Sequence, residues 1–381
     1  MKVLHVFTID STPKSFFDGQ FRFLSDEGNQ DIHLVTASEK DEEFCQRNHL
    51  QYHQIDIARR IDIKTDFRSI SKLKNLFKRE RFDIVVGHTP KGALVAMCAA
   101  FLSGVKRRVY YRHGLIYTTS SGASRLLLKT IERFTGLLST HIVNVSHSLS
   151  RLAVKDGLNS DKKQSVFGHG TCGGIDTLDL FNPELIDSEE LMKLRQELDL
   201  NDSFVVGFCG RVCKEKGIRE LIDGFRLFAS AHPELNPRLL LVGGFDTRDI
   251  LPDEYKQLIE SSSEIIQTGK VPKEKLPLYY SLMDVFVFPS YREGFGMSVI
   301  EAGAMNVPAL VSRSHGCEDS IKENVSGQYI DISPEGIKEA LEYICKPENR
   351  DKLASQCRNH IVNHYDRSIL WPQILNFYSN L

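Results

Sequence analysis

Short apolar runs alternate with amphipathic segments along most of the chain. The runs are rich in Val, Ile, Leu, Phe and Tyr, which is typical of strands buried on both faces of a parallel sheet. The pattern predicts strands over 3–7, 32–35, 83–86, 109–111, 141–145, 204–208, 239–242, 265–267, 285–288 and 309–311. Between them, apolar positions at helical spacing predict helices over 17–28, 66–81, 91–103, 122–138, 216–231, 252–261, 273–282, 297–305 and 334–346.

Two successive sets of such β-α units indicate two α/β domains, each with a parallel sheet covered by helices on both faces. A glycine-rich segment, 168–185, separates the two sets. We therefore predict domains over 1–172 and 173–365. The last residues, 366–381, carry Trp371, Ile374 and Tyr378 at helical spacing, so we expect a closing helix that packs back on the first domain.

Length and composition exclude several classes of protein. The 381 residues are 41% apolar and 26% charged, which is ordinary for a globular chain and unlike a disordered or fibrous one. The longest apolar run, 93–102, is too short to cross a bilayer, and the first residues read as a core strand rather than a signal peptide. The eight cysteines include no C-x-x-C pair, so we expect a reducing cytoplasm, no disulfide framework and no structural zinc.

The net charge of −2 conceals an uneven distribution. Residues 1–175 carry 26 Lys+Arg and 17 Asp+Glu, whereas residues 176–381 carry 22 and 33. A basic half indicates an anionic partner, although a merely solvated basic surface has the same composition. Two basic amphipathic stretches, Lys72–Arg81 and Arg125–Arg133, either lie on an anionic membrane surface or pack their apolar side on the sheet. We expect no nucleic-acid binding, because no basic motif is interleaved with aromatic residues.

The most informative motif is Pro289–Ala302, which follows a predicted strand and opens a helix. It carries Glu293, then the turn Gly294-Phe295-Gly296, then Glu301 inside the helix. Glycines let a ligand approach the backbone, and the amides at a helix N-terminus attract phosphate. The two carboxylates are placed to accept hydrogen bonds from hydroxyl groups on the same ligand.

A second motif follows the strand 204–208 and also opens a helix. It holds Gly210, Arg211 and Lys216 in Gly-Arg-Val-Cys-Lys-Glu-Lys-Gly. A guanidinium and an ammonium at a sheet edge are able to neutralise a diphosphate, although a solvated basic turn fits the same letters. The chain contains neither Asp-x-Asp nor H-E-x-x-H, so we expect no metal ion.

Together these motifs resemble the retaining GT-B glycosyltransferases of family four. Gly-Arg…Glu-Lys-Gly is followed about eighty residues later by Glu-Gly-Phe-Gly…Glu, as in that family. The linker Gly174-Ile-Asp176…Phe181-Asn-Pro183, the pair His113-Gly114 and the pair Val145-Ser146 are also similar. The resemblance implies two Rossmann-like domains whose parallel sheets face each other across a cleft. The first would bind the acceptor and the second a nucleotide sugar.

The resemblance also implies roles for residues of the second domain. Arg211 and Lys216, beside Gly210, would bind the donor diphosphate. Glu301 would hold the ribose hydroxyls, and Glu293, before Gly294, would contact the donor sugar. The amides of Phe295, Gly296 and Met297 would face the phosphates, and the backbone of Val271 would meet the base.

In the first domain, the resemblance places His113 by the transferred sugar and Gly19 at the reaction centre on the acceptor side. Many members of the family carry a Gly-Gly pair where this chain reads Phe17-Asp18-Gly19-Gln20. This difference weakens the transfer of the role to Gly19.

The implied activity is the retaining, metal-independent transfer of a hexose or N-acetylhexosamine from a nucleotide-diphosphate sugar, with UDP favoured over GDP. The acceptor would be a glycan, lipid-diphosphate-linked, in the assembly of a bacterial capsule or other surface polysaccharide. We expect no cofactor, and a cytoplasmic enzyme that is peripheral on the inner face of the membrane. Two alternatives stay open: a nucleotide-sugar epimerase with the same fold, and a non-catalytic protein that binds nucleotide sugars.

Overall fold

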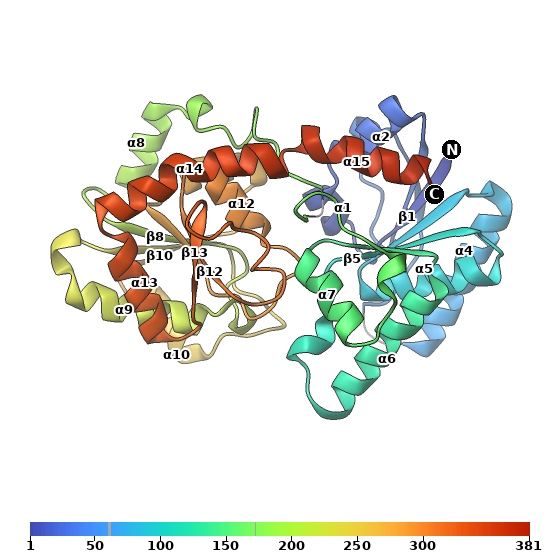
Figure 1. The fold of residues 1–381 in the computed structure, drawn as a ribbon, viewed down its shortest axis with the longest axis horizontal. Helices are drawn as coiled ribbons and strands as arrows, with labels where there is room; N and C mark the ends of the chain where they lie inside the picture. The colour runs from blue at the N-terminus through green and yellow to red at the C-terminus, as the bar shows by residue number, and fades with distance from the viewer. Residues whose placement is uncertain (60–61, 172) are drawn as a thin grey trace. The chain divides into compact units, whose positions relative to one another are not determined.

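The computed structural model describes residues 1–59, 62–171 and 173–381 (Figure 1). The chain divides into two compact units, Met1–Gly174 with Ser368–Leu381, and Ile175–Arg367. The divisions lie two residues after the boundaries expected from the sequence, at 172 and 365. Cys172, the last residue of the expected first domain, lies outside the described residues.

The first unit contains a seven-stranded parallel sheet in the order β3-β2-β1-β4-β5-β6-β7. Its strands are β1 Lys2–Val6, β2 Asp31–Thr36, β3 Leu50–Gln54, β4 Ile84–His88, β5 Arg107–Arg112, β6 His141–Asn144 and β7 Gln164–Ser165. Its helices are α1 Ser11–Phe16, α2 Gln20–Gly28, α3 Glu42–Arg47, α4 Ile63–Glu80, α5 Pro90–Leu102, α6 Gly122–Leu138, α7 His147–Lys155 and α15 Arg367–Ser379, with the short 3-10 helices η1 Ile116–Thr119 and η2 Asp161–Lys163.

The second unit contains a six-stranded parallel sheet in the order β10-β9-β8-β11-β12-β13. Its strands are β8 Val205–Cys209, β9 Arg238–Val242, β10 Ile265–Gly269, β11 Val285–Phe288, β12 Ala309–Ser312 and β13 Gly327–Ile330. Its helices are α8 Ser188–Glu197, α9 Ile218–Ala231, α10 Asp253–Ser261, α11 Leu276–Tyr280, α12 Met297–Ala304, α13 Pro334–Ile344 and α14 Pro347–Tyr365, with the 3-10 helices η3 Pro183–Leu185, η4 Lys214–Lys216, η5 Pro233–Leu235 and η6 Lys273–Lys275.

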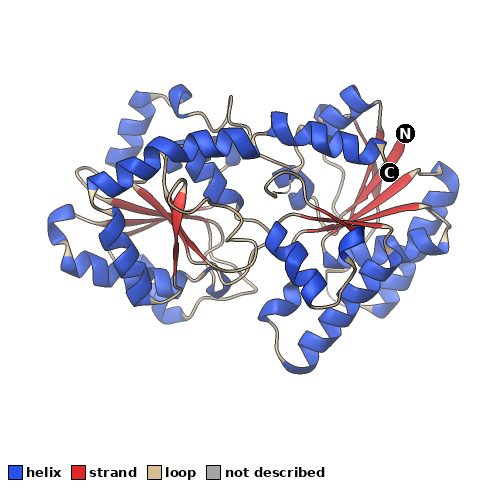
Figure 2. Ribbon diagram, in the orientation of Figure 1, coloured by secondary structure: helices blue, strands red, loops and turns tan. Residues whose placement is uncertain are grey.

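Helices cover both faces of each sheet, as Figure 2 shows. This arrangement explains why the central strands carry apolar side chains at consecutive positions: Val285–Phe288 and Ala309–Ser312 are buried along their whole length. All ten predicted strands are confirmed, and the predicted α/β class with two parallel sheets is confirmed with them.

The last helix, α15, packs on the first unit. Trp371 donates its indole N–H to the carbonyl oxygen of Gly173 at 2.7 Å, and its ring lies 5.4 Å from that of Phe23. Further along the helix, Tyr378 packs edge-on against His5, with ring centroids 6.1 Å apart. The chain therefore returns to the unit in which it began.

The basic stretch Lys72–Arg81 lies on α4, and its apolar side chains are buried. Leu73, Leu76 and Phe77 are at most 5% exposed and belong to the hydrophobic core of the first unit. Of the two options left open for this stretch, the structure therefore shows the one in which the apolar side packs inward. Within the described residues, no helix has both the length and the apolar character needed to cross a membrane.

Candidate functional site

The predicted residues of the second unit gather at one edge of its sheet. Gly210 and Arg211 directly follow β8, Val271 follows β10, and Glu293 lies in the loop between β11 and α12. Because all strands of this sheet are parallel, these loops share the carboxyl edge, where ligands bind in α/β proteins. The candidate site is therefore one surface built from loops that are far apart in the sequence.

Lys216 and Glu293 form an ion pair within this surface. The ammonium of Lys216, in η4, donates to Oε1 of Glu293, and the two side chains are only 11% and 14% exposed. The ammonium also lies 5.5 Å from the ring centroid of Phe288, at the end of β11. Shielding from water strengthens such a pair compared with one on an open surface.

Two glycines with left-handed backbone allow this close approach. Gly217 has φ of 66°, and a Cβ atom there would lie 2.2 Å from the carbonyl oxygen of Pro289. Gly316 has φ of 85°, and a Cβ atom there would lie 2.5 Å from the carbonyl oxygen of Glu293. Any other residue would strain the backbone and push apart the loops that bring Lys216 to Glu293.

Arg211 is held by an acidic partner but remains 46% exposed. Its guanidinium donates to Asp246, a residue of the loop after β9 that is 5% exposed. Burial opposes ionisation of Asp246, but the amide of Asp249, the guanidinium of Arg211 and the amide of Arg248 together hold its pKa below the ordinary range. Asp246 thus stays charged and orients a guanidinium that remains partly exposed.

Glu215 ties the same loops together. Its carboxylate accepts from Nε of Arg292 at 2.6 Å and lies 3.8 Å from Nη2 of Arg211. Its amide donates to Oδ2 of Asp249 at 2.6 Å. Glu215 therefore fixes η4 against the loops after β9 and β11, and so fixes the position of Lys216.

The three predicted amides at the N-terminus of α12 differ in their partners. The amide of Met297 donates to the carbonyl oxygen of Phe295 at 2.9 Å. The amides of Phe295 and Gly296 have no acceptor within the described residues. Two of the three predicted N–H groups are thus available to an anion, beside Gly294 and Glu293.

Glu301 lies in α12 and accepts a hydrogen bond from the hydroxyl of Tyr280 at 2.8 Å. Burial raises the pKa of Glu301, and Lys273 and the Tyr280 hydroxyl work against this rise. Nearby, burial raises the pKa of the Cys209 thiol to about 12. Cys209 is therefore a neutral thiol at neutral pH, as expected of a core residue rather than a nucleophile.

Two further predicted residues offer only their backbone. Gly210 donates its amide to the carbonyl oxygen of Val242 at 2.9 Å, which holds the end of β8 against β9. The amide of Val271 has no acceptor within the described residues. Of these two, Val271 is the one whose amide N–H is open to a ligand.

In the first unit, His113 belongs to a row of three histidines on the adjacent strands β1, β4 and β5 or just beyond them. Nε2 of His113 lies 3.1 Å from Nδ1 of His88, and Nε2 of His88 lies 2.9 Å from Nδ1 of His5. Burial lowers the pKa of His5 to about 3, that of His113 to about 4, and that of His88 well below its ordinary value. All three imidazoles are thus neutral at pH 7, so each carries one N–H group and one acceptor nitrogen. Nε2 of His5 is buried and has no hydrogen-bond partner among the described residues.

Gly19 lies at the start of α2 with φ of 78°. Its amide donates to Oδ1 of the buried residue Asn48 at 2.7 Å, and a Cβ atom there would lie 3.2 Å from the Trp371 ring. The amide is therefore already satisfied, and Gly19 makes room for α15. These contacts explain the glycine without the predicted role at the reaction centre.

Comparison with known proteins identifies the family. The model of the family "Glycosyl transferases group 1" matches residues 192–361, and that of the family "Glycosyl transferase 4-like" matches residues 6–144. CapM of Staphylococcus aureus, a capsular polysaccharide biosynthesis glycosyltransferase, is 30% identical over 380 residues, which cover 99% of this chain and 97% of CapM. The chain belongs to the group 1 glycosyltransferases.

Two further proteins resemble this glycosyltransferase. An Escherichia coli enzyme, UDP-Gal:alpha-D-GlcNAc-diphosphoundecaprenol alpha-1,3-galactosyltransferase, is 24% identical over 315 residues, covering 81% of this chain and 78% of the enzyme. The structure of HepE from Anabaena with UDP-glucose superposes with a TM-score of 0.81 at 17% identity and covers all of both chains. The likeness to solved structures confirms the predicted GT-B fold.

Several residues that position the site were missed from the sequence. Asp246, Tyr280 and His88 were not singled out, although each touches a residue that was. His88 could have been found from the sequence, because it lies at the carboxyl end of a strand, just as His113 lies directly after one. Asp246 and Tyr280 had none, because their contacts with Arg211 and Glu301 depend on which strands are neighbours in the sheet.

The part of this glycosyltransferase that the structure describes contains no group of three or more His, Cys, Asp and Glu residues suited to a metal ion. At the candidate site the nearest carboxylates, those of Asp246 and Glu293, are already paired with Arg211 and Lys216. Of these four charged groups, the Arg211 guanidinium is the most exposed, at 46%, whereas Lys216 and Glu293 are 11% and 14% exposed.

Proposed function

We propose that this glycosyltransferase transfers a sugar from a nucleoside diphosphate sugar to a glycan acceptor. The observation that supports it is the arrangement at the carboxyl edge of β8 and β11. There Arg211, Lys216 and the open amides of Phe295 and Gly296 lie on loops at the same edge of the sheet, and we propose that they bind the diphosphate together. Cations and helix N-termini are the groups that bind diphosphate in proteins.

The same arrangement suits the chemistry of transfer. When the bond between the anomeric carbon and the diphosphate breaks, negative charge develops on the leaving group. Preorganised donors stabilise this charge best, since they need no rearrangement as the reaction proceeds. In our proposal Arg211, already oriented by Asp246, and Lys216, already oriented by Glu293, supply the charge that a metal ion supplies in other enzymes.

The remaining groups are assigned to the rest of the donor. Glu301 accepts hydrogen bonds from the ribose hydroxyls, Glu293 accepts from the sugar, and the open amide of Val271 meets the base. His113 is proposed to contact the transferred sugar, where a neutral imidazole serves a hydroxyl group as donor or acceptor.

We further propose that the anomeric configuration is retained by attack from the face of the leaving group. The acceptor hydroxyl oxygen bonds to the anomeric carbon as its bond to the diphosphate breaks, and the hydroxyl proton passes to the departing phosphate. This route needs no protein nucleophile, which agrees with the protonated thiol of Cys209.

The names of the relatives indicate the substrate class. CapM is named for capsular polysaccharide biosynthesis, and the Escherichia coli relative for UDP-galactose as donor and a lipid-diphosphate-linked sugar as acceptor. We propose the same class here: a UDP sugar as donor, and a lipid-diphosphate-linked saccharide of a surface polysaccharide as acceptor.

Donor choice is tested by thermal unfolding with UDP, GDP and their sugars, because a bound nucleotide raises the unfolding temperature by mass action. The preferred UDP sugar is then incubated with undecaprenyl-diphosphate-linked saccharides in detergent and chelator. Transfer to the lipid-linked saccharide is expected. Isomerised UDP sugar without any acceptor would instead identify an epimerase, and binding without turnover a non-catalytic protein.

A further inference from the structure

Helix α6 of the first unit exposes an apolar surface that no described part of this unit covers. Leu126, Leu127, Phe134 and Leu137 are 69%, 51%, 47% and 70% exposed. A surface helix of a globular domain normally turns such side chains inward, as α4 does with Leu73, Leu76 and Phe77. We call these four residues, with the basic residues described next, the α6 surface.

The charges of the α6 surface have one sign. Arg125, Lys129 and Arg133 lie on the same helix. Within the described residues no carboxylate lies within 4 Å of the Arg125 or Arg133 guanidinium, whereas the Lys129 ammonium, 34% exposed, pairs with Asp156 at 3.3 Å. The single acidic residue of α6, Glu132, is 4% exposed and points inward, where it accepts from the hydroxyl of Tyr110 at 2.9 Å. The helix thus presents apolar side chains and cations together.

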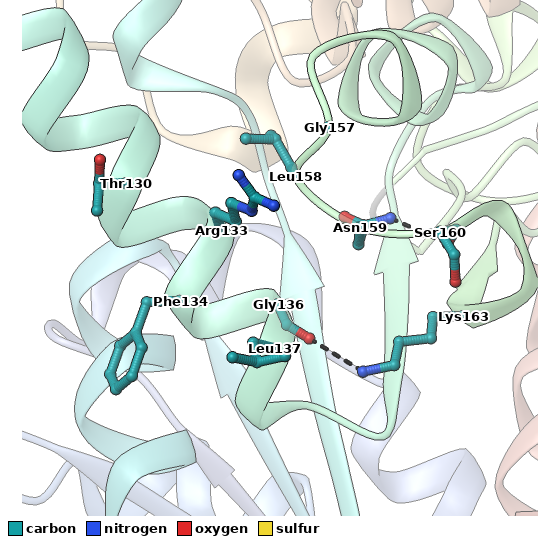
Figure 3. Close-up of a pocket in the computed structure, with 10 residues that line it drawn as sticks. All are labelled: Thr130, Arg133, Phe134, Gly136, Leu137, Gly157, Leu158, Asn159, Ser160 and Lys163. Atoms are coloured by element: carbon teal, nitrogen blue, oxygen red, sulfur yellow. Dashed lines mark hydrogen bonds between the residues drawn. The ribbon is translucent and has the colours of Figure 1, made fainter.

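Beside the last turns of α6 lies a cavity of about 610 Å³ (Figure 3). Arg133, Phe134 and Leu137 line it from the helix, and Asn159 and Lys163 line it from the loop before β7. None of its lining residues carries a carboxylate. Lys163 is held in place by the carbonyl oxygen of Ser139 at 3.0 Å, so its charge stays beside the helix. An apolar rim around two cations suits a phosphate group attached to acyl chains.

The end of α5 carries a similar set of side chains. Phe101 and Leu102 are 54% and 61% exposed, and the exposed cations Lys106 and Arg107 follow them. The helix α5, which packs against α6, thus ends in the same combination of apolar and basic side chains. This combination is typical of proteins that bind to the interface of an anionic membrane.

We propose that the α6 surface docks this glycosyltransferase on an anionic phospholipid bilayer. Leu126, Leu127, Phe134 and Leu137 enter the boundary between headgroups and acyl chains. Arg125, Lys129 and Arg133 contact lipid phosphates, and the cavity beside Lys163 receives one of them. The inference rests on the proposed function in one respect, because a lipid-linked acceptor is what gives the docking its use.

The test uses vesicle cosedimentation with the full chain and no substrate. Vesicles contain phosphatidylcholine alone or with 30 mol% phosphatidylglycerol, at roughly 0.1 M and 0.5 M salt, which bracket weak and strong screening. We compare the wild type with L126S/L127S/F134S/L137S, with R125Q/K129Q/R133Q, and with the control K72Q/K74Q/K78Q. The last two remove the same charge, one from α6 and one from α4.

The wild type should bind the anionic vesicles and lose binding at high salt. Both α6 variants should lose at least about tenfold in vesicle binding. For the charge variant, the reason is that each cation near an anionic surface contributes about fivefold to the affinity. The vesicle binding of the α4 control should stay within about twofold of that of the wild type at the same salt concentration. Unfolding temperatures equal to the wild type show that the variants fold.

Three results would overturn the proposal: no binding of the wild type, equal losses for the two charge variants, or self-association that the apolar variant abolishes in place of vesicle binding. The last would mean that a second copy of the chain covers the α6 surface. Transfer in detergent is measured separately. Transfer without vesicle binding refutes only the docking, and vesicle binding without transfer refutes only the proposed function.

Discussion

Replacing Lys216 by methionine probes the centre of the candidate site. The substitution keeps the length and the apolar stem of the side chain but removes the ammonium that pairs with Glu293. The carboxylate of Glu293, 14% exposed, then has no cation beside it. Lys214 provides the matched control, because it lies in the same 3-10 turn and is exposed.

Stability and catalysis should both respond. Breaking a buried ion pair costs about 3–5 kcal/mol of unfolding free energy. The side chains of Lys216 and Glu293 keep 11% and 14% of their exposure, so water stabilises the lone carboxylate in part. We therefore expect a loss of about 2–3 kcal/mol for K216M. Removing one donor to developing charge lowers the rate by about 10²–10³, whereas K214M should keep the rate within about twofold.

Chemical denaturation and UDP release from the donor sugar measure these two effects. The double variant K216M/E293Q should lose less stability than the two single variants added together, by about 1–2 kcal/mol, because it leaves no unpaired charge. If K216M resembles K214M in rate, Lys216 does not stabilise the leaving group. If the single losses simply add within about 0.5 kcal/mol, the pair is not energetically coupled.

Three further perturbations test other parts of the account. R211Q should weaken UDP binding about 10–100-fold, as expected for loss of a charged hydrogen bond. The control R248Q should change UDP binding little, because the Arg248 side chain is 63% exposed. Titration calorimetry measures both affinities, and equal effects would show that Arg211 is not part of the donor site. G217A should cost at least about 2 kcal/mol of stability through backbone strain and the clash with Pro289. The control G104A should cost about 1 kcal/mol, because Gly104 has φ of 71° but open space around it. Equal losses in denaturant unfolding would contradict the close contact between Gly217 and Pro289. Lowering the pH from 7.5 to 5.5 should reduce the free energy of unfolding by about 1.4 kcal/mol for each of His5, His88 and His113, because the unfolded imidazoles bind protons below pH about 6.5 and the folded ones do not. The variant H88Q should lose less stability over this range than the wild type. A pH dependence of H88Q equal to that of the wild type would contradict the burial of His88.

The strands that the sequence missed are all at sheet edges. β3 and β7 end the first sheet, and β13 ends the second. An edge strand has one neighbour and part of its surface in water, so Leu50–Gln54 and Gly327–Ile330 carry polar side chains that a search for apolar runs overlooks. The central strands are buried from both faces, and this is why the same search found all of them.

The helix α14 was missed for a related reason. Its buried residues Leu353, Cys357, Ile361 and Tyr365 form a narrow stripe among polar ones, so the helical period is faint in the sequence. The candidate site divides in the same way. Glycines and charged residues after strands were visible as motifs, whereas the pairing of Lys216 with Glu293, 77 residues apart, follows only from the sheet order that makes β8 and β11 neighbours.

The exposure of α6 shows what a single sequence leaves open. Lys72–Arg81 and Arg125–Arg133 have similar basic amphipathic patterns, and either one alone fits a helix packed on a sheet. The difference lies in how each helix is rotated about its axis. That rotation buries Leu73, Leu76 and Phe77 of α4 but leaves Leu126, Leu127 and Leu137 of α6 in solvent.

The most direct measurement of the account is titration calorimetry of UDP binding in the presence of EDTA, for the wild type and for R211Q/K216M. We expect the wild type to bind UDP without any divalent cation and the double variant to lose at least about a hundredfold in affinity. Binding that disappears in EDTA and returns with Mg²⁺, or a double variant that binds as tightly as the wild type, would contradict a diphosphate site made of Arg211, Lys216 and backbone amides.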